Sequence, residues 1–273
     1  MRRVLERSSP DQRFEFGKNW DRFLSVLNDE RIREAEKCLV DMLEYKDLRG
    51  KSFLDIGSGS GLLSLAARRL GARVHSFDYD PQSVTCTSYL RNRYYSGEQN
   101  WTVEEGSVLD AEYMESLGRF DIVYAWGVLH HTGDMWKAMY NAQIPVDDGG
   151  ILFVAIYNDQ GLQSQFWRGV KRTFCSGLLG KMLIIGVFCP CFFLRGLAVD
   201  LIRLQNPIKR YTEPKERGMS RFHDWMDWLG GYPFEVAKPG EILSFYRKQG
   251  FTLQRMETTN GHGNNEFLFE KTS

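Results

Sequence analysis

The sequence lacks an excess of either charge, because 35 lysines and arginines balance 35 aspartates and glutamates over 273 residues. A balanced chain produces no overall field toward a polyanion, so we expect no nucleic-acid partner. The first residues, MRRVLERSSPDQRF, contain no apolar run, so we expect no secretory signal. No internal repeat is visible either.

Cysteines are few and show no pattern. Five are spread along the chain without the spacing of a disulfide framework. Cys189 and Cys191 flank a proline and have no obvious metal-ligand partners nearby, so no metal is expected. An odd number of cysteines fits reduced thiols, and we therefore expect a cytoplasmic protein.

The most informative stretch, residues 51–80, is KSFLDIGSGSGLLSLAARRLGARVHSFDYD. A short apolar run, typical of a buried strand, ends at Gly57, Gly59 and Gly61. These glycines permit a tight turn and a close approach of the backbone to a ligand. Apolar residues at helical spacing follow, and a second strand then ends at Asp78. This order is one half of a nucleotide-binding α/β fold, in which the acid binds ribose hydroxyls.

The glycine spacing does not match a dinucleotide fingerprint. GxGxxG requires a third glycine at the position of Leu62. Asp55 precedes Gly57 by two residues, close enough for its carboxylate to approach an ammonium group or to brace the turn. A ligand with an amino-acid tail and no pyrophosphate therefore fits better. The stretch resembles motif I of the class I S-adenosylmethionine-dependent methyltransferases, (D/E)xGxGxG with an acid at the end of the second strand.

This resemblance implies S-adenosylmethionine as the cofactor. The implied cofactor-binding residues are Asp55, Gly57, Ser58, Gly59, Gly61, Asp78, Tyr79, Ser107, Val108 and Trp126. Asp55 would lie near the amino group, Asp78 at the ribose and Tyr79 beside the adenine. Ser107 stands where the family usually has an acid near the adenine amine, and Asp110 is the nearer carboxylate. The contact therefore stays open between these two residues.

Later segments keep the order of the same family. The expected strands are residues 100–104, 120–125, 151–156, 251–257 and 266–270, the expected helices are 81–95, 135–143 and 241–248, and 145–150 is an expected turn. FDIVYAWGVLHHTGD followed by GGILFVAIYN resembles motifs IV to VI of small-molecule methyltransferases. The predicted fold class is therefore α/β, with a Rossmann-like seven-stranded sheet, an antiparallel last strand, helices on both faces, and a helical, aromatic cap insertion.

The predicted domains are an N-terminal helical lid (1–48), a cofactor-binding core (49–159), a cap or substrate insertion (160–238), and the completion of the sheet (239–273). The insertion is too long for a simple connection. Near the N-terminus, apolar residues recur every three or four positions, which predicts amphipathic helices. Phe16, Lys18 and Trp20 there either cover the cofactor or only dock these helices.

Inside the insertion, residues 182–194 (MLIIGVFCPCFFL) are almost wholly apolar. This run is too short to span a bilayer, and Pro190 is expected to break a helix. Residues 168–221 hold eleven basic and three acidic residues, a net charge of +8, which leaves −8 for the rest. This pattern predicts contact with an anionic membrane surface, at the inner membrane face. The alternative is a cap that packs on the core or on a second subunit, which leaves a homodimer open.

Methyl transfer displaces an already activated leaving group, so positioning is the main task of the protein. A hydroxyl acceptor also needs a base, for which an imidazole is suited. His130, His131 and His262 fall on loops at the predicted ligand edge, and His131 is the preferred base. Each of these could equally be a satisfied loop histidine. The candidate substrate-binding residues are Asn158, Trp225, Trp228 and Tyr232, although the aromatic ones also suit a packed cap.

The sequence therefore predicts a methyltransferase that acts on a small or lipid-like acceptor, at a hydroxyl oxygen. It is similar to the polyprenyl-hydroxyphenol O-methyltransferases of quinone biosynthesis and to related uncharacterised bacterial members of the family. The alternatives are N-methylation of a peptide, a sugar or a natural product, and a catalytically silent cofactor-binding scaffold.

Overall fold

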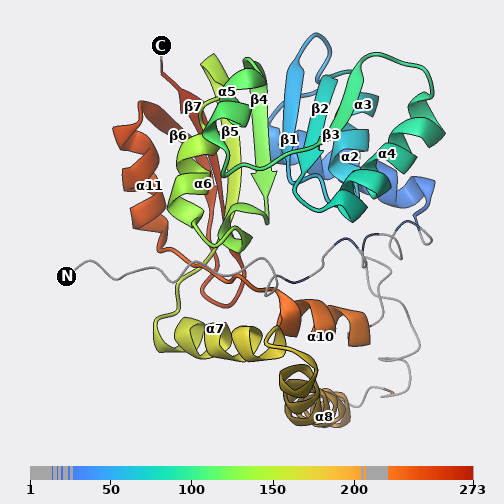
Figure 1. Ribbon diagram of the computed structural model, residues 1–273, viewed down its shortest axis with the longest axis vertical. Helices are drawn as coiled ribbons and strands as arrows, with labels where there is room; N and C mark the ends of the chain where they lie inside the picture. Colours follow the sequence, from blue (N-terminus) through green and yellow to red (C-terminus); the bar gives the residue numbers. More distant parts are fainter. Residues whose placement is uncertain are drawn as a thin grey trace. The chain divides into compact units, whose positions relative to one another are not determined.

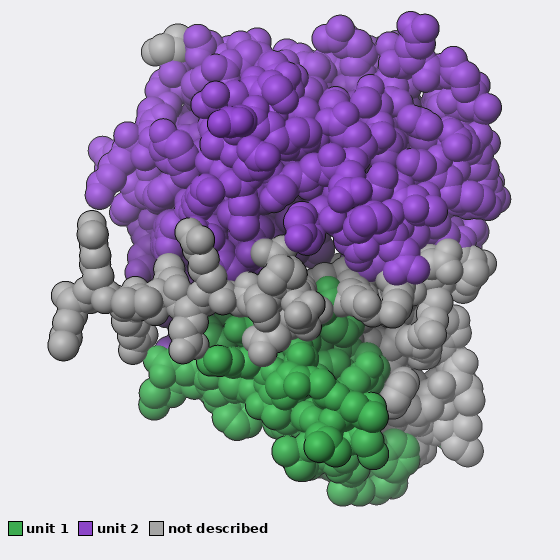
Figure 2. Space-filling view, in the orientation of Figure 1, with its two compact units in different colours: residues 1–14, 162–234 green, residues 15–161, 235–273 purple. Residues whose placement is uncertain are grey.

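The computed structural model describes residues 14, 17, 20, 24, 27–203, 206 and 221–272. The chain divides into two compact units, coloured separately in Figure 2. The sheet unit comprises residues 15–161 and 235–273, and the helical unit comprises residues 1–14 and 162–234. The helical unit therefore includes an insertion into the chain of the sheet unit.

The sheet unit contains a single seven-stranded sheet (Figure 1). Its strands are β1 (Ser52–Ile56), β2 (Arg73–Asp78), β3 (Trp101–Glu105), β4 (Phe120–Trp126), β5 (Val146–Tyr157), β6 (Phe251–Glu257) and β7 (Asn264–Lys271). Their order is β3-β2-β1-β4-β5-β7-β6, and β7 runs antiparallel to both of its neighbours. The predicted fold class is confirmed. The strand order reverses between β1 and β4, and α/β sheets bind ligands at such a switch point.

Helices cover both faces of this sheet. They are α2 (Asp29–Leu43), α3 (Leu62–Arg69), α4 (Pro81–Tyr95), α5 (Ala111–Ser116), α6 (Met135–Ala142), α11 (Pro239–Lys248) and the short 3-10 helix η2 (Leu129–His131). Successive residues of β1 point to opposite faces of the sheet. Phe53 packs in the core under α2 and α3, and Leu54 packs in the core under α5, α6 and α11. This alternation is the period of a strand buried on both sides.

The predicted turn at residues 145–150 is wrong, because β5 already begins at Val146. Phe120 pairs with Val146, but the next pair is Ile122 with Ile151, so the ladder is irregular between them. Gly149 has a positive φ of 71°. The glycine-rich and acidic residues 146–150 therefore form an irregular part of β5. Their composition is typical of a turn, which is why the sequence predicted one.

The helical unit contains α7 (Leu162–Phe174), α8 (Leu178–Ile202) and α10 (Arg221–Gly230). Its small core includes Val170, Phe174, Ile184 and Leu229. The prediction that Pro190 breaks the apolar helix is wrong, because α8 runs through it for 25 residues. A proline inside a helix costs about 3 kcal/mol, and here the helix is held on both sides of it by packing. At about 1.5 Å per residue, α8 is long enough and apolar enough to cross a membrane.

Candidate cofactor and methyl-transfer site

The first part of the site is the glycine-rich loop at the carboxyl end of β1. Gly57, Gly59 and Gly61 have positive φ angles of 72°, 55° and 77°, which glycine adopts without strain. The backbone N–H groups of Gly57 and Ser58 donate to the carbonyl oxygen of Phe77 over 2.8 and 3.1 Å. These bonds hold the loop against the end of β2.

Neighbouring groups fill the space over two of these glycines. A Cβ on Gly57 would lie 2.6 Å from a methyl carbon of Val128, and one on Gly61 would lie 2.8 Å from Cα of Thr87. The hydroxyl oxygens of Ser58 and Thr87 share a hydrogen bond of 2.9 Å. Packing as well as φ therefore excludes larger residues, and it brings the β4 loop directly against the glycine loop.

Asp78, the predicted ribose-binding acid, lies beside this loop. Its Oδ2 accepts a hydrogen bond from the N–H of Gly59 over 2.9 Å, and its Oδ1 accepts one from the N–H of Asp80 over 2.9 Å. Burial raises the pKa of Asp78 to about 6, although these hydrogen bonds favour the charged form. Tyr79, next in the chain, has a side chain that is 55% exposed. A carboxylate and an exposed ring thus adjoin the glycine loop at the end of β2.

Asp55 is buried beneath the loop rather than exposed at its edge. It accepts a hydrogen bond from the hydroxyl of Ser64 on α3. Ser76 donates to Ser64 over 2.8 Å, and the indole N–H of Trp101 donates to Ser76 over 2.9 Å. Burial raises the pKa of Asp55 to about 7, and the charge of Asp78 acts in the same direction. This network fits the reading in which Asp55 braces the turn. In the sequence, the sign of this network was Ser64, a polar residue within an otherwise apolar helix face.

Part of the N-terminal segment lies on the same loop. A Cβ on Gly59 would lie 3.1 Å from the indole of Trp20, so this ring covers the loop from outside. The N–H of Gly17 donates to Oδ2 of Asp80 over 2.8 Å. Of the proposed lid residues, Phe16 and Lys18 lie outside the described residues.

The predicted adenine contacts follow β3. The N–H of Gly106 donates to the carbonyl oxygen of Asp78 over 3.0 Å, so this loop adjoins the ribose acid. Ser107 accepts a hydrogen bond from the N–H of Leu109 over 3.2 Å, and Val108 is buried. Asp110 is exposed and caps α5. The choice between Ser107 and Asp110 as the adenine contact therefore stays open.

Three aromatic rings gather where β4 and β5 end. His130 is fully buried, and its ring centroid lies 4.0 Å from that of Tyr157 and 4.5 Å from that of His131. His131 is half-buried and lies 5.5 Å from Tyr157. Tyr157, the last residue of β5, was not predicted as a site residue. Its position between an apolar strand and Asn158 was the only sequence signal.

Glu235 organises the loop that carries these histidines, and sequence reasoning also missed it. Its carboxylate accepts hydrogen bonds from the N–H groups of Gly133 and Met135 over 3.0 and 3.1 Å, at the start of α6. Its own N–H donates to the carbonyl oxygen of His130 over 3.0 Å. Nothing local in the sequence links residue 235 with a loop about a hundred positions earlier.

The β6–β7 hairpin holds two other predicted residues. The indole N–H of Trp126 donates to Glu266 over 2.8 Å. The side-chain amide of Asn158 donates to the carbonyl oxygen of Thr259 over 2.9 Å. Asn158 therefore anchors the hairpin loop, and His262 is exposed on that loop.

The predicted aromatic substrate residues belong to the helical unit. The ring of Trp228 lies 5.4 Å from that of Trp167, and Nζ of the buried Lys171 lies 4.2 Å above it. The ring of Trp225 lies 5.6 Å from that of Phe192. The carbonyl oxygen of Tyr232 accepts a hydrogen bond from the N–H of Phe14 over 3.0 Å. Their part in substrate binding stays a prediction.

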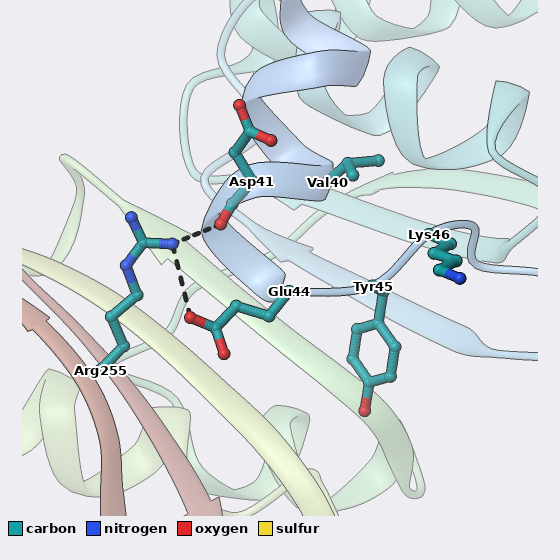
Figure 3. A pocket seen from close by; sticks show the side chains of 6 residues that line it. All are labelled: Val40, Asp41, Glu44, Tyr45, Lys46 and Arg255. Atoms are coloured by element: carbon teal, nitrogen blue, oxygen red, sulfur yellow. Dashed lines mark hydrogen bonds and ion pairs between the residues drawn. The ribbon is translucent and has the colours of Figure 1, made fainter.

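A shallow depression elsewhere in the sheet unit carries no comparable chemistry. The end of α2 and strand β6 form it, and its lining residues are Val40, Asp41, Glu44, Tyr45, Lys46 and Arg255 (Figure 3). Arg255 crosses it to donate to the carbonyl oxygen of Asp41 and to pair with Glu44 over 3.7 Å. The depression contains none of the predicted site residues.

The strand order, the antiparallel β7, the glycine loop and the acid at the end of β2 together define a class I S-adenosylmethionine-dependent methyltransferase fold. Comparison with known proteins agrees. Residues 27–177, more than half of the chain, match a family model described as a methyltransferase domain. The chain belongs to this methyltransferase family, and its cofactor is S-adenosylmethionine.

Its relatives include ubiquinone biosynthesis O-methyltransferases. That of Methylobacterium sp. (strain 4-46) is 28% identical over 163 residues, which are 60% of this chain and 58% of the relative. That of Rhizobium etli is 32% identical over 47% of this chain and 50% of the relative. Ribosomal protein L11 methyltransferase of Anoxybacillus flavithermus is 31% identical over 36% of each chain. The matches thus span between 36% and 58% of the length of these curated relatives.

Among solved structures, magnesium protoporphyrin IX methyltransferase of Synechocystis PCC 6803 with bound SAH has a TM-score of 0.55 at 14% identity. The alignment covers 93% of this chain and 94% of that one. At this identity the likeness concerns the fold.

Proposed function

We propose that this protein transfers a methyl group from S-adenosylmethionine to a hydroxyl oxygen of a small or lipid-like acceptor. The observation that carries the proposal is the ring cluster of His130, His131 and Tyr157 at the ends of β4 and β5. Val128, directly before η2, packs on Gly57. His130 follows Val128 by two positions in the chain. The ring cluster therefore begins close to the glycine loop that is expected to hold the cofactor.

The residues around the glycine loop have the chemical groups that S-adenosylmethionine requires. Gly57, Ser58 and Gly59 provide a close backbone approach for its methionine and ribose parts. Asp78 offers carboxylate oxygens to two ribose hydroxyls, and the loop at Ser107 would border the base. When bound, the cofactor supplies a methyl group on a sulfonium, which is activated for displacement without further acid catalysis.

The task of the chain is to orient the acceptor, exclude water and accept one proton. His130 is fully buried, and the contact of its ring with the tilted ring of Tyr157 holds the loop in place. His131 is half-buried, so its imidazole can both meet an acceptor and take the hydroxyl proton as the oxygen attacks. Exposure therefore favours His131 over His130 as the base.

Two kinds of relative bear on the acceptor. The ubiquinone biosynthesis O-methyltransferases support transfer to oxygen. The ribosomal protein L11 methyltransferases favour a second candidate, methylation of a protein. We favour oxygen because histidines, rather than a carboxylate cluster, gather at the acceptor edge. We also infer a cytoplasmic protein, because the five cysteines lack the spacing of a disulfide framework, which fits a reducing compartment.

The test is transfer of labelled methyl from S-adenosylmethionine to substituted catechols and prenylated hydroxyphenols, with amines and ribosomal protein as the alternative acceptors. His131→Ala is expected to lower kcat with the hydroxyl acceptors about 10²- to 10⁴-fold. Binding of S-adenosylhomocysteine, measured by calorimetry, should stay unchanged. His75→Ala, which removes a strand histidine 3.2 Å from Glu104, is the matched control, and His262→Ala tests a second candidate base. Equal turnover in wild type and His131→Ala would contradict a base at this position.

A further inference from the structure

Helix α8 has an extensive exposed apolar surface. Its exposed large apolar residues, with exposed fractions between 46% and 84%, are Leu178, Leu179, Met182, Leu183, Val187, Phe193, Leu194, Leu201 and Ile202. At about 100° per residue they occupy more than half of the helix circumference. A row spaced by three or four residues, including Leu179, Leu183, Val187, Pro190 and Leu194, runs along its outward side. Soluble proteins seldom expose such a surface without a partner for it.

The opposite side of α8 packs within the helical unit. The ring of Phe188 lies 5.5 Å from that of Trp167 on α7, and the ring of Phe192 lies 5.6 Å from that of Trp225 on α10. Ile184 belongs to the same small core. These contacts occupy the middle of α8. A bilayer-crossing α8 would therefore pull both partner helices, with their charged residues, into the hydrocarbon, which is costly.

The charges of α7, of α8 and of the turn between them are nearly all basic. Residues 162–203 contain six basic residues and a single acid, Asp200, which is buried. Lys181 and Arg195 are exposed but share the helix side of Ile185 and Phe192, their neighbours four and three positions away. The outward row therefore has no charge, and the two cations stand on the other side of the helix, as the polar side of a helix does at a lipid interface.

We propose that α8 lies in the plane of an anionic bilayer, with its outward apolar face among the acyl chains and Lys181 and Arg195 at the phosphates. The matched family model ends at residue 177, directly before this helix. Surface helices of soluble proteins carry an apolar stripe of about 100° or more, whereas the exposed apolar residues of α8 spread over more than half of its circumference. In-plane docking inserts the outward row and keeps the opposite face on α7 and α10.

The test is flotation of the full chain with phosphatidylethanolamine–phosphatidylglycerol vesicles and with phosphatidylcholine vesicles. Wild type is expected to float with the anionic vesicles and to bind more weakly as salt rises. The double variant Leu179→Glu, Leu183→Glu should weaken partitioning at least about tenfold. The matched control, Tyr89→Glu with Tyr140→Glu, changes two exposed aromatic residues of α4 and α6, each 51% exposed, and should float like wild type.

Charge-reversal variants test the contribution of the cations to vesicle binding separately from that of the apolar row. Lys181→Glu with Arg195→Glu should abolish the preference for anionic over neutral vesicles. Arg33→Glu with Lys37→Glu, on the exposed side of α2, should keep it. Thermal unfolding of each variant without lipid establishes that it folds. These assays use no methyl transfer, so their outcome is independent of the proposed function.

Orientation is read from a fluorophore attached in turn at Leu179→Cys, Val187→Cys and Leu201→Cys, which share the outward face, with Cys38 and Cys191 replaced by Ser. In-plane docking predicts that shallow lipid quenchers act alike on all three sites. A Val187→Cys label deeper than the other two would show a spanning helix and overturn the proposal. The proposal also fails if wild type does not float at low salt, or if the Leu179→Glu, Leu183→Glu variant floats equally well. A lipid-free dimer dissociated by that variant would identify a second copy as the occupant instead.

Discussion

The backbone N–H of Glu235 donates a hydrogen bond to the carbonyl oxygen of His130 over 3.0 Å. The carboxylate of the same residue accepts from the N–H groups of Gly133 and Met135. One residue therefore fixes both ends of the loop between the buried histidine and α6. Because Glu235 follows the inserted segment directly, the histidine loop is set at the point where the chain re-enters the sheet unit.

Glu235→Ala removes the acceptor for two N–H groups at the start of α6. We expect a loss of about 1–2 kcal/mol in unfolding free energy, as for other lost helix caps. The histidine loop should also become less ordered, so kcat should fall further than the affinity for S-adenosylhomocysteine. Chemical denaturation and single-turnover kinetics measure the two effects. Asp134→Ala, which removes the N-cap side chain of the same helix, is the control, and an equal kcat loss there would contradict a positioning role for Glu235.

Asp55 should make stability depend on pH. Its pKa is raised from 3.8 to about 7 by burial in the folded protein. The folded state therefore holds more protons between these values, and stability falls as pH rises from about 4 to about 7. Asp55→Asn should be more stable than wild type above pH 7 by up to roughly 4 kcal/mol and nearly equal to it at pH 4. Urea unfolding at both pH values checks this. A difference independent of pH would exclude the buried carboxyl as its source.

Asp78 should make cofactor binding depend on pH. Its pKa is about 6 in the ligand-free protein, and ribose hydroxyls donate best to the ionised carboxylate. Affinity for S-adenosylhomocysteine should therefore rise by up to about tenfold per pH unit below pH 6 and level off above pH 7. Calorimetry from pH 5 to pH 8 measures it. Asp78→Asn should bind weakly with a flat profile, while Asp110→Asn keeps the wild-type profile. A wild-type affinity that does not change over this range would argue against Asp78 at the ribose.

The glycine loop offers a test that separates backbone strain from packing. Gly57→Ala combines a positive φ of 72° with a Cβ placed 2.6 Å from Val128. Gly97→Ala has a similar φ of 80° and open space around its Cβ. Strain alone costs about 1 kcal/mol, so Gly97→Ala should lose about that much. Gly57→Ala should lose more and bind S-adenosylhomocysteine at least about tenfold more weakly. Equal losses in thermal unfolding would mean that Val128 simply moves aside.

Much of the sheet unit followed from local sequence signals. The apolar run before Gly57, the acid at the end of β2 and the Asp80–Pro81 helix start predicted their elements because each depends on neighbours in the chain. The antiparallel β7 followed from the final hairpin. The expectation that Pro190 breaks the helix was wrong. The free-energy cost of a proline can be read from the local sequence, whereas the tertiary packing of Ile184, Phe188 and Phe192 that holds α8 cannot.

By itself, the sequence determined the glycine turn, the acid beside it, the family resemblance and hence the cofactor, since all of these lie within one short βαβ segment. Only the tertiary structure decided that Asp55 faces Ser64 under the loop, that Tyr157 meets His130, and that Glu235 caps α6. Each of those pairings joins residues brought together by packing or by the order of strands, and the pattern of neighbouring residues does not encode such contacts.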